Sequence, residues 1–319
     1  MTSTADPNRT YAAAHFALEL KGVDKLGMFR SIEGGGIKAD VTTYQNGGIY
    51  DKWRQLGKPK FEDLKLQVGM AMSAPFYRWI AEFFKGVPTR KDGTIIAADF
   101  YYKERARRQF ENAMIKEMAF PKLDASDKNT AYMVVTLAVE DMKFMPPTSS
   151  VVKQDMGNEA QKSWKACNFR FTLDGFGDIF KRVTKVDGFS VKQNIVEYHA
   201  GGARTPTLTP SAIEFPQLSF TLPEADAQPL IDHFMKRTVG SGGVGDGKSV
   251  PGRFGGHIET FDNAQQNKFM MQFMDADIVN IQPDKSDAST EEIKQVKVDL
   301  VIEKMSFDYQ VNAEPPSAL

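Results

Sequence analysis

Hydrophobic and polar residues alternate in short runs along most of the chain, and this period of two is typical of half-buried strands. The runs that show it best are residues 16–20, 37–44, 64–68, 135–142, 169–173, 191–198, 218–222 and 298–305. Four of these runs lie in each half of the chain. Each half is therefore predicted to contain at least four strands.

One segment in each half has helical spacing instead. Residues 73–86 start with Ser73, a favoured helix N-cap, have Pro75 in the first turn and stop at Gly86. Residues 224–237 follow the same plan, with His233 in the place of the first segment's Trp79, which suggests a packing position. The patterns together predict a mainly β (α+β) protein in which each half is an antiparallel sheet system covered by one helix.

The two halves are copies of one unit. A shift of 154 residues aligns more than 40 positions without a gap, among them Gly34 with Gly188, Tyr44 with Tyr198 and Pro75 with Pro229. Upstream, residues 15–22 face residues 168–175 after a one-residue change of shift. Downstream, a shift of 163 aligns residues 135–144 with 298–307, including Glu140 with Glu303. The order of matches is the same in both halves, which predicts a tandem duplication.

Proline pairs and small polar residues suggest where the units begin and end. We expect a first domain at residues 1–145, a linker at 146–165 that starts with Pro146 and Pro147, and a second domain at 166–311. The remaining residues, 312–319, contain Pro315 and Pro316 and are expected to form a loose tail.

The composition fits a soluble protein of two domains, with 41% hydrophobic residues, 25% charged residues and a net charge of −1. The sequence has no apolar run near the ~18 to 20 residues that a membrane span needs, and its first ten residues lack the apolar stretch of a signal peptide. These features predict synthesis in a cytoplasm and no membrane insertion. The single cysteine, Cys167, excludes an intrachain disulfide and is expected to act as a small core residue.

The most suggestive chemical motif is residues 242–249, which fit the phosphate-binding pattern G-x-x-x-x-G-K-[ST] with Lys248 as its lysine. That chemistry needs a strand before the loop and a helix after it. Here a predicted helix precedes the loop, while Pro251 and several glycines follow it. A flexible loop is the better interpretation, and a nucleotide-dependent enzyme is a minor alternative.

Other chemistry finds little support. The four histidines have no metal-ligand spacing, and no nucleophile motif is present. Residues 101–108 mix aromatic and basic side chains, but their counterpart, taken as residues 258–262, is acidic, so a solvated strand or a subunit contact is favoured over nucleic-acid binding. We therefore predict no catalytic residue, no cofactor and no metal site.

Paired glycines follow a tyrosine at the end of one predicted strand in each unit. The residues are Tyr44, Gly47 and Gly48 in the first unit and Tyr198, Gly201 and Gly202 in the second. Glycine at such a place allows a positive φ or a close backbone approach. A turn or hairpin is therefore expected after each tyrosine.

The layout of each unit resembles the tail tube proteins of contractile phages and related injection systems. The features that carry the resemblance are an opening strand that ends in glycine, the Tyr-x-x-Gly-Gly segment at 198–202, the strand at 64–68, the helix with Trp79, and a closing strand with Glu-x-Met-x-Phe. The resemblance covers residues 12–145 once and 166–310 again.

This resemblance implies β-sandwich or barrel-like tube domains, each with one helix, that form six-fold rings and stack into a tube for DNA or protein cargo. Hairpins of neighbouring subunits would pair to close an inner barrel, with Tyr44, Gly47, Gly48, Tyr198, Gly201 and Gly202 at those hairpins. Implied partners are the protein itself, a sheath and a baseplate hub. The implied location is a virion tail or an extracellular or cytoplasmic injection particle.

The duplication departs from the family, whose members have one unit. Three chains could form a pseudo-six-fold ring, or six chains could leave one unit outside the ring. The expected function is a structural component of the inner tail tube. Alternatives are a tube-like baseplate adaptor or initiator between hub and tube, and a soluble duplicated β ligand-binding module.

Overall fold

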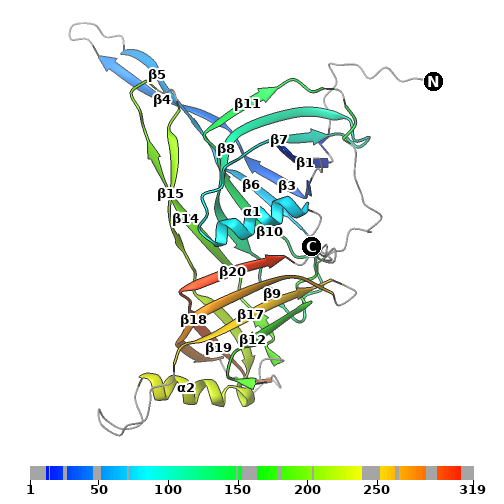
Figure 1. Cartoon of the computed structure of the whole chain (residues 1–319), viewed down its shortest axis with the longest axis vertical. Coiled ribbons are helices and arrows are strands. Elements are labelled where there is room, and N and C mark those ends of the chain that lie inside the picture. The colour runs from blue at the N-terminus through cyan, green and yellow to red at the C-terminus, as the bar shows by residue number, and fades with distance from the viewer. Residues whose placement is uncertain are drawn as a thin grey trace, which may run out of the picture.

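The computed structural model describes residues 12–13, 15–23, 27–45, 52–69, 72–148, 150–152, 164–177, 182–202, 205–238, 252–262, 266–284 and 293–309. These residues are mainly strand, with two α-helices, as the alternation predicts (Figure 1). The tip of the first hairpin with Gly47 and Gly48, most of the linker, the glycine-rich motif at 242–249 and the tail at 312–319 lie outside the described residues.

A ten-stranded antiparallel sheet contains most strands of the first half and two strands of the second. Its main order is β2-β1-β7-β8-β10-β6-β3, and β11, β14 and β15 join at the sides. The strands are β1 (His15–Leu20), β2 (Gly27–Phe29), β3 (Ser31–Gly34), β6 (Leu64–Val68), β7 (Lys91–Ala98), β8 (Glu104–Phe120), β10 (Met133–Ala138), β11 (Asp141–Met145), β14 (Phe189–Tyr198) and β15 (Thr207–Glu214).

An eight-stranded antiparallel sheet contains the other strands of the second half and one strand of the first. Its order is β12-β17-β18-β19-β16-β13-β9, with β20 beside β18. The strands are β9 (Leu123–Asp124), β12 (Phe169–Leu173), β13 (Lys185–Val186), β16 (Leu218–Pro223), β17 (Phe254–Phe261), β18 (Asn267–Pro283), β19 (Gln295–Val301) and β20 (Lys304–Tyr309).

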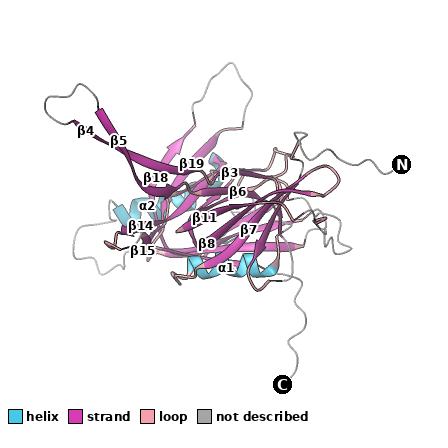
Figure 2. Ribbon diagram, turned by 90° about the horizontal axis from the view of Figure 1, so that it is seen from above, coloured by secondary structure: helices cyan, strands magenta, loops and turns pink. Residues whose placement is uncertain are grey.

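A separate two-stranded hairpin, β4 (Ile37–Gln45) and β5 (Lys52–Phe61), projects from the body of the protein (Figure 2). The first helix, α1 (Ala74–Phe84), has Pro75 in its first turn and is followed by Gly86 with φ 72°, as the sequence predicts. The second helical segment is shorter than predicted, because residues 224–226 form a 3-10 turn and α2 begins later (Gln228–Thr238).

Strand register confirms the duplication residue by residue. Met118 lies opposite Val135 in the first sheet, and Ile281 lies opposite Val298 in the second. Each residue of the second pair is 163 positions after its counterpart, and the neighbouring irregularities of register also coincide. Asn112 and Asp275, again 163 residues apart, both have positive φ, at 54° and 55°. The two units therefore share their backbone path, including its strained positions.

This register corrects one alignment made from the sequence. Residues 101–108 were expected to match residues 258–262, but β8 matches β18 along its whole length with the shift of 163. The counterpart of residues 101–108 is therefore 264–271, and residues 258–262 match 95–99. The long strands β8 and β18 mix charged, apolar and methionine residues, so their alternation is too irregular to identify them by pattern alone.

The hydrophobic core continues from one half of the chain into the other. One cluster of buried side chains contains Trp79 of the first half and Phe307 of the second. Helix α1 contributes to this continuity, because Tyr77 stacks on Tyr309 with ring centroids 3.7 Å apart and Phe84 stacks on Phe307 at 5.9 Å. The division into domains at residues 145 and 166 stays a prediction.

A buried carboxylate fixes the chain after β11 to the start of β8. Glu104 is 1% exposed and accepts hydrogen bonds from Arg107 Nε (2.8 Å), Thr148 Oγ1 (2.7 Å) and Ser150 Oγ (3.2 Å). Burial alone raises the pKa of Glu104, but the hydrogen bonds from Arg107 and Thr148 outweigh it and lower the pKa from 4.5 to about 2.

We expect Glu104→Gln to lower the free energy of unfolding by about 2 kcal/mol near neutral pH, because a buried hydrogen-bonded charge is lost. The folded-state pKa lies below the ordinary value, so the carboxylate stabilises the fold above about pH 4.5, and this contribution is lost as the pH falls towards 2. Urea unfolding of both proteins measures the effect. The difference between them should be constant above about pH 5 and shrink in acid; a constant difference down to pH 2.5 would contradict the assignment.

The repeat offers a matched pair of phenylalanines for testing the continuous core. Phe307 is 1% exposed among Phe84, Phe120 and Phe269, whereas its counterpart Phe144 is 60% exposed. Phe307→Ala should cost about 3–4 kcal/mol of unfolding free energy, and Phe144→Ala should change it by less than about 0.5 kcal/mol in the isolated chain. Equal effects in chemical unfolding would show that the two halves do not share a core as described.

Candidate assembly interface

One strand passes from the second unit into the sheet of the first. Its beginning, β13, pairs with β16 in the second sheet, and its continuation, β14, pairs with β8 of the first sheet. In this pairing Phe189 lies opposite Phe120 and Val191 opposite Met118. The second-unit hairpin β14–β15 thereby covers the edge of the first unit's sheet (Figure 1). We call this contact the in-chain junction.

Close backbone approach and charge support the in-chain junction. A Cβ atom at Gly188 would lie 3.0 Å from the carbonyl oxygen of Phe120, so a larger residue would push the strands apart. Lys192 Nζ lies 3.5 Å from Glu117 Oε1 across the strand pair. The aromatic rings of Phe120 and Phe189 stack at 4.9 Å.

Two charged side chains of the first unit hold the outer edge of the hairpin. Leu208 N donates to Glu140 Oε1 at 2.8 Å, and Arg90 Nη2 donates to Leu208 O at 2.7 Å. Arg90 Nε lies 3.9 Å from Glu140 Oε1. We call these two side chains the Arg90–Glu140 clamp. Edge strands expose backbone groups that attract other strands, and the clamp satisfies both groups of Leu208.

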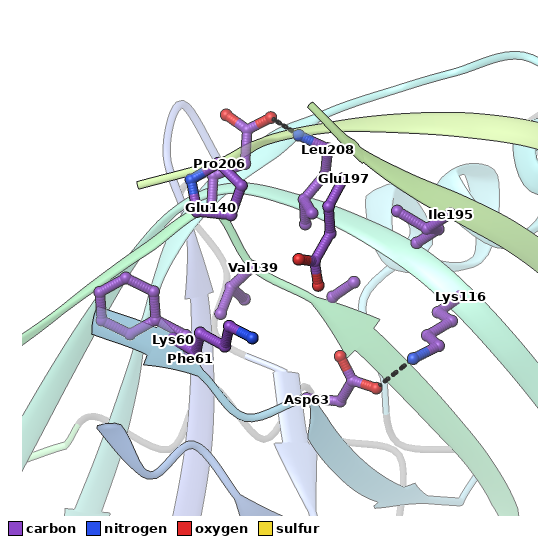
Figure 3. Close-up of a pocket in the computed structure, with 11 residues that line it drawn as sticks. Lys60, Phe61, Asp63, Lys116, Val139, Glu140, Ile195, Glu197, Pro206 and Leu208 are labelled. Carbon is purple, nitrogen blue, oxygen red and sulfur yellow. Dashed lines mark hydrogen bonds and ion pairs between the residues drawn. The ribbon is translucent and has the colours of Figure 1, made fainter. Parts of the chain in front are cut away.

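A small polar cavity lies beside the clamp, between the two hairpins (Figure 3). Its volume is about 80 Å³, and Glu140, Glu197 and Ile195 are among the residues that line it. Lys116 and Asp63 pair at 2.6 Å on its wall. Ligand sites for small molecules usually enclose about 300–1,000 Å³, so this cavity is too small for one.

The described hairpin residues that the sequence singled out lie at strand ends. Tyr44 is the second-last residue of β4, Tyr198 is the last residue of β14, and both are more than half exposed. Gly201 and Gly202 form the expected turn, but neither has a positive φ, and a Cβ atom at either would meet open space. Their conformational role was therefore wrongly predicted, and a role of these residues between subunits stays a prediction.

The first unit exposes a hairpin and a phenylalanine whose counterparts in the second unit pack against the first unit. Hairpin β4–β5 is the repeat of β14–β15, with the same register and the same irregularity, yet almost all of its residues are exposed. At its base lies an open groove of about 610 Å³ beside Gly35, Arg108 and Phe144. In the second unit, the counterpart of Phe144 is Phe307, which packs against Phe84 and Phe120 of the first unit.

The second unit exposes the edge of β18, whose counterpart in the first unit, the edge of β8, is covered by β14. Residues 114–119 of β8 pair with β10, and residues 117–120 also pair with β14. Residues 277–283 of β18 pair with β19 on one side, and the described residues place no strand on the other side. Helix α2 buries only Leu230, whereas α1 buries six residues, partly against β20. The chain therefore has two complementary surfaces, hairpin β4–β5 of the first unit and the edge of β18 in the second unit.

Sequence reasoning missed the strands and side chains that build this interface. The edge of β8 and the Arg90–Glu140 clamp were not recognised, although the alignment of Glu140 with Glu303 was a signal that this carboxylate recurs. The alignment of His233 with Trp79 gave a correct packing position: His233 contacts Phe176 and Phe254, and burial lowers the pKa of its imidazole.

Other chemistry has little basis in the described part of the chain. There, no group of three or more histidine, cysteine or acidic side chains is placed to hold a metal ion. Cys167 is half-buried and lies 3.5 Å from the side-chain oxygen of Asn168. None of the described helices is long and apolar enough to cross a membrane.

Several solved structures are similar to this chain. A chain from an extracellular contractile injection system, the PVC sheath-tube complex in the extended state, is 20% identical with a TM-score of 0.40, covering 46% of this chain and 99% of that one. A chain from the anti-feeding prophage (AFP) baseplate is 15% identical with a TM-score of 0.38, covering 43% and 97%. An Hcp1 mutant from E. coli EAEC 042 is 15% identical with a TM-score of 0.27, covering 46% and 93%. Likenesses this distant carry no conclusion about function.

A comparison with curated proteins gives no match. The model of one protein family does match, over residues 12–143, and its description is T4-like virus tail tube protein gp19. The matched segment coincides with the first copy of the repeat, from β1 to β11. Residues 12–143 of this chain are therefore similar to the T4-like virus tail tube protein gp19 family.

Proposed function

We propose that this protein is a structural subunit of the inner tube of a contractile tail or injection apparatus, and that three chains form one pseudo-six-fold ring. The observation that supports the ring best is the in-chain junction. The repeat contains a second copy of each of its two surfaces, hairpin β4–β5 in the first unit and the edge of β18 in the second unit, and both copies are left uncovered in the single chain. A heterologous contact of this kind continues from chain to chain and forms a ring when the rotation between successive units closes.

The repeat specifies the register of the contact between chains. Val191 lies opposite Met118 in the in-chain junction, and their counterparts are Ile37 and Ile281. Lys192 lies opposite Glu117, and their counterparts are Lys38 and Asn280. We infer that β4 of one chain pairs antiparallel with the open edge of β18 in the next chain, with Ile37 opposite Ile281.

The in-chain junction also favours three chains over six. It joins the two units edge to edge, so both units can form part of the ring. A ring of six such units, the number that the family resemblance implies, then contains three chains. Each unit would supply four strands to a continuous barrel: β3–β4, β6, β10 and β8 in the first unit, and β13–β14, β16, β19 and β18 in the second.

A barrel of about 24 strands, spaced ~4.8 Å apart and tilted by ~40°, has a backbone diameter of roughly 50 Å, wider than barrels that already hold an aqueous channel. The face of these strands opposite the core is polar. Lys297 pairs with Asp187 at 2.7 Å, and Ser219 donates to Asp299 at 2.6 Å. This face suits a wet channel for DNA or protein cargo.

Rings of this kind would stack into a tube inside a sheath and on a baseplate hub, within a virion tail or an injection particle. A tube-like adaptor between hub and tube remains an alternative with the same ring. A ligand-binding module has less support, because the cavity between the hairpins is only about 80 Å³. The role proposed here is structural and assigns no catalysis to the chain.

Electron microscopy of the purified protein at high concentration should show rings or hollow tubes, with three chains in each ring. Mass photometry of the rings counts the chains independently. A protein that stays monomeric at all concentrations, and also beside its sheath and hub, would contradict the proposal. Rings of six chains would retain the tube and overturn the proposed symmetry.

Engineered cysteines test the register directly. In a Cys167→Ala background, Ile37→Cys with Ile281→Cys should form disulfides between chains under mild oxidation and give a covalent trimer on a non-reducing gel, because opposed residues on neighbouring strands bring Cα atoms within reach. The control is Ile37→Cys with Gln282→Cys, which places the thiols on opposite faces of the sheet. Equal cross-linking of the two pairs would contradict the inferred strand pairing.

A further inference from the structure

The Arg90–Glu140 clamp has a complete counterpart in the second unit. A shift of 163 residues takes Arg90 to Arg253 and Glu140 to Glu303. Arg253 Nη1 and Glu303 Oε1 form an ion pair. The Glu303 side chain is 50% exposed, against 13% for Glu140, which has Leu208 in front of it. In the part of the second unit that the structure describes, the same two side chains are therefore present without a strand in the place of the hairpin.

The counterpart of the clamped residue Leu208 is Arg54 on β5. Leu208 lies opposite Glu197 in its hairpin, and Arg54 lies opposite Thr43 at the same register. Since Leu208 gives its N–H and C=O to the clamp, this register position directs both groups to the outer edge of the hairpin. The N–H and C=O of Arg54 therefore point away from β4, where a partner can reach them.

The side chains around the clamp differ between the two copies in a complementary way. Leu208 packs in a small apolar cluster with Met114 and Ala138 of the first unit. The counterpart of Met114 is Asp277, and the counterpart of Leu208 is Arg54. An apolar pair inside one chain is thus replaced by an acidic residue whose side chain is 19% exposed and by a basic residue on the exposed hairpin. The counterpart of Ala138 is Val301, which stays apolar.

Asp277 is already placed to bind a basic group. Arg237 Nε lies 2.5 Å and Arg253 Nε 4.0 Å from the same oxygen, Asp277 Oδ2. This arrangement leaves Oδ1 to accept from a further guanidinium. If Arg253 donates to a backbone carbonyl as Arg90 does, Asp277 also gains room for a new partner.

We propose that Arg54 of one chain binds the second unit of the next chain at this site. Glu303 accepts a hydrogen bond from Arg54 N–H, Arg253 donates to Arg54 C=O, and the Arg54 guanidinium pairs with Asp277. The inference rests on the proposed ring and identifies a charged contact that closes it. The partner it fits is a second copy of this chain.

The test exchanges the charged pair for the apolar pair of the in-chain junction. Arg54→Leu and Asp277→Met should each raise the protein concentration needed for ring formation by about tenfold or more, because each leaves one charge facing an apolar side chain. The double variant Arg54→Leu/Asp277→Met recreates the Leu208–Met114 contact, so its loss should be clearly smaller than the sum of the two single losses, although Arg237 then lacks Asp277 as its partner. Sedimentation velocity over a dilution series measures the concentration.

The clamp itself is tested with Glu303→Ala, which should raise the same concentration by about tenfold. Glu259→Ala is a control for the loss of an Arg–Glu pair elsewhere in the same unit, because Glu259 pairs with Arg170 at 3.2 Å, although it also accepts a hydrogen bond from Asn267. Thermal melting of every variant checks the fold. Should Asp277→Met fail to fold, Arg54→Glu on the exposed hairpin should still weaken ring formation at least as much as Arg54→Leu, because it removes the guanidinium and brings a carboxylate near Asp277 and Glu303.

The outcomes separate this inference from the ring itself. Absence of rings for the parent protein contradicts the proposed function. Rings that form at unchanged concentration in Arg54→Leu, Arg54→Glu and Glu303→Ala overturn the Arg54 site and leave the ring standing. Additive losses in the double variant, without recovery, show that Arg54 and Asp277 do not face each other.

Discussion

The pairing of β14 with β8 is the constraint on which the rest of the structure depends. A strand that begins in one sheet and ends in the other cannot satisfy its backbone within its own unit, so the two copies fold against each other. Helix α1 then has β20 of the second copy as its second layer, which explains why it buries six side chains while α2 buries one. Because the units are copies, a contact that forms once inside the chain predicts the same contact between the corresponding surfaces of neighbouring chains.

The two versions of this contact have different chemistry for a physical reason. The in-chain junction forms during folding and can be aromatic and apolar, as Phe84, Phe120 and Phe307 are. The surfaces at the chain ends face water until another chain arrives, and a large apolar patch there would favour aggregation. At the same register, Thr238 takes the place of Phe84 and Pro283 that of Phe120. In the proposed ring, sequence divergence between the copies thus follows from when each surface is buried.

Much of the fold could be predicted from the sequence, because its signals are local. Period-two alternation found the strands around Leu66 and Phe220, and Pro75 with Gly86 marked the first helix. Only the start of the long strand β8 was anticipated, as a solvated strand or a subunit contact at residues 101–108. The rest was missed because Arg107, Arg108 and Glu111 interrupt its alternation, while the sheet decides its conformation. The crossing of β14 into another sheet was also missed, since the pattern of a strand states which face is apolar and not which strand lies beside it.

Covalent linkage of the units lowers the binding free energy that the contacts between chains must supply to form a ring. Six separate subunits would lose translational and rotational freedom at every contact, whereas in a three-chain ring half of the contacts form within a chain at high effective concentration. The in-chain junction also fixes the rotation between successive units, and the value of this rotation decides between a closed ring and an open filament. Contacts between chains can then be polar and reversible, and a hydrogen-bonded charged site around Arg54 provides orientation more than raw affinity.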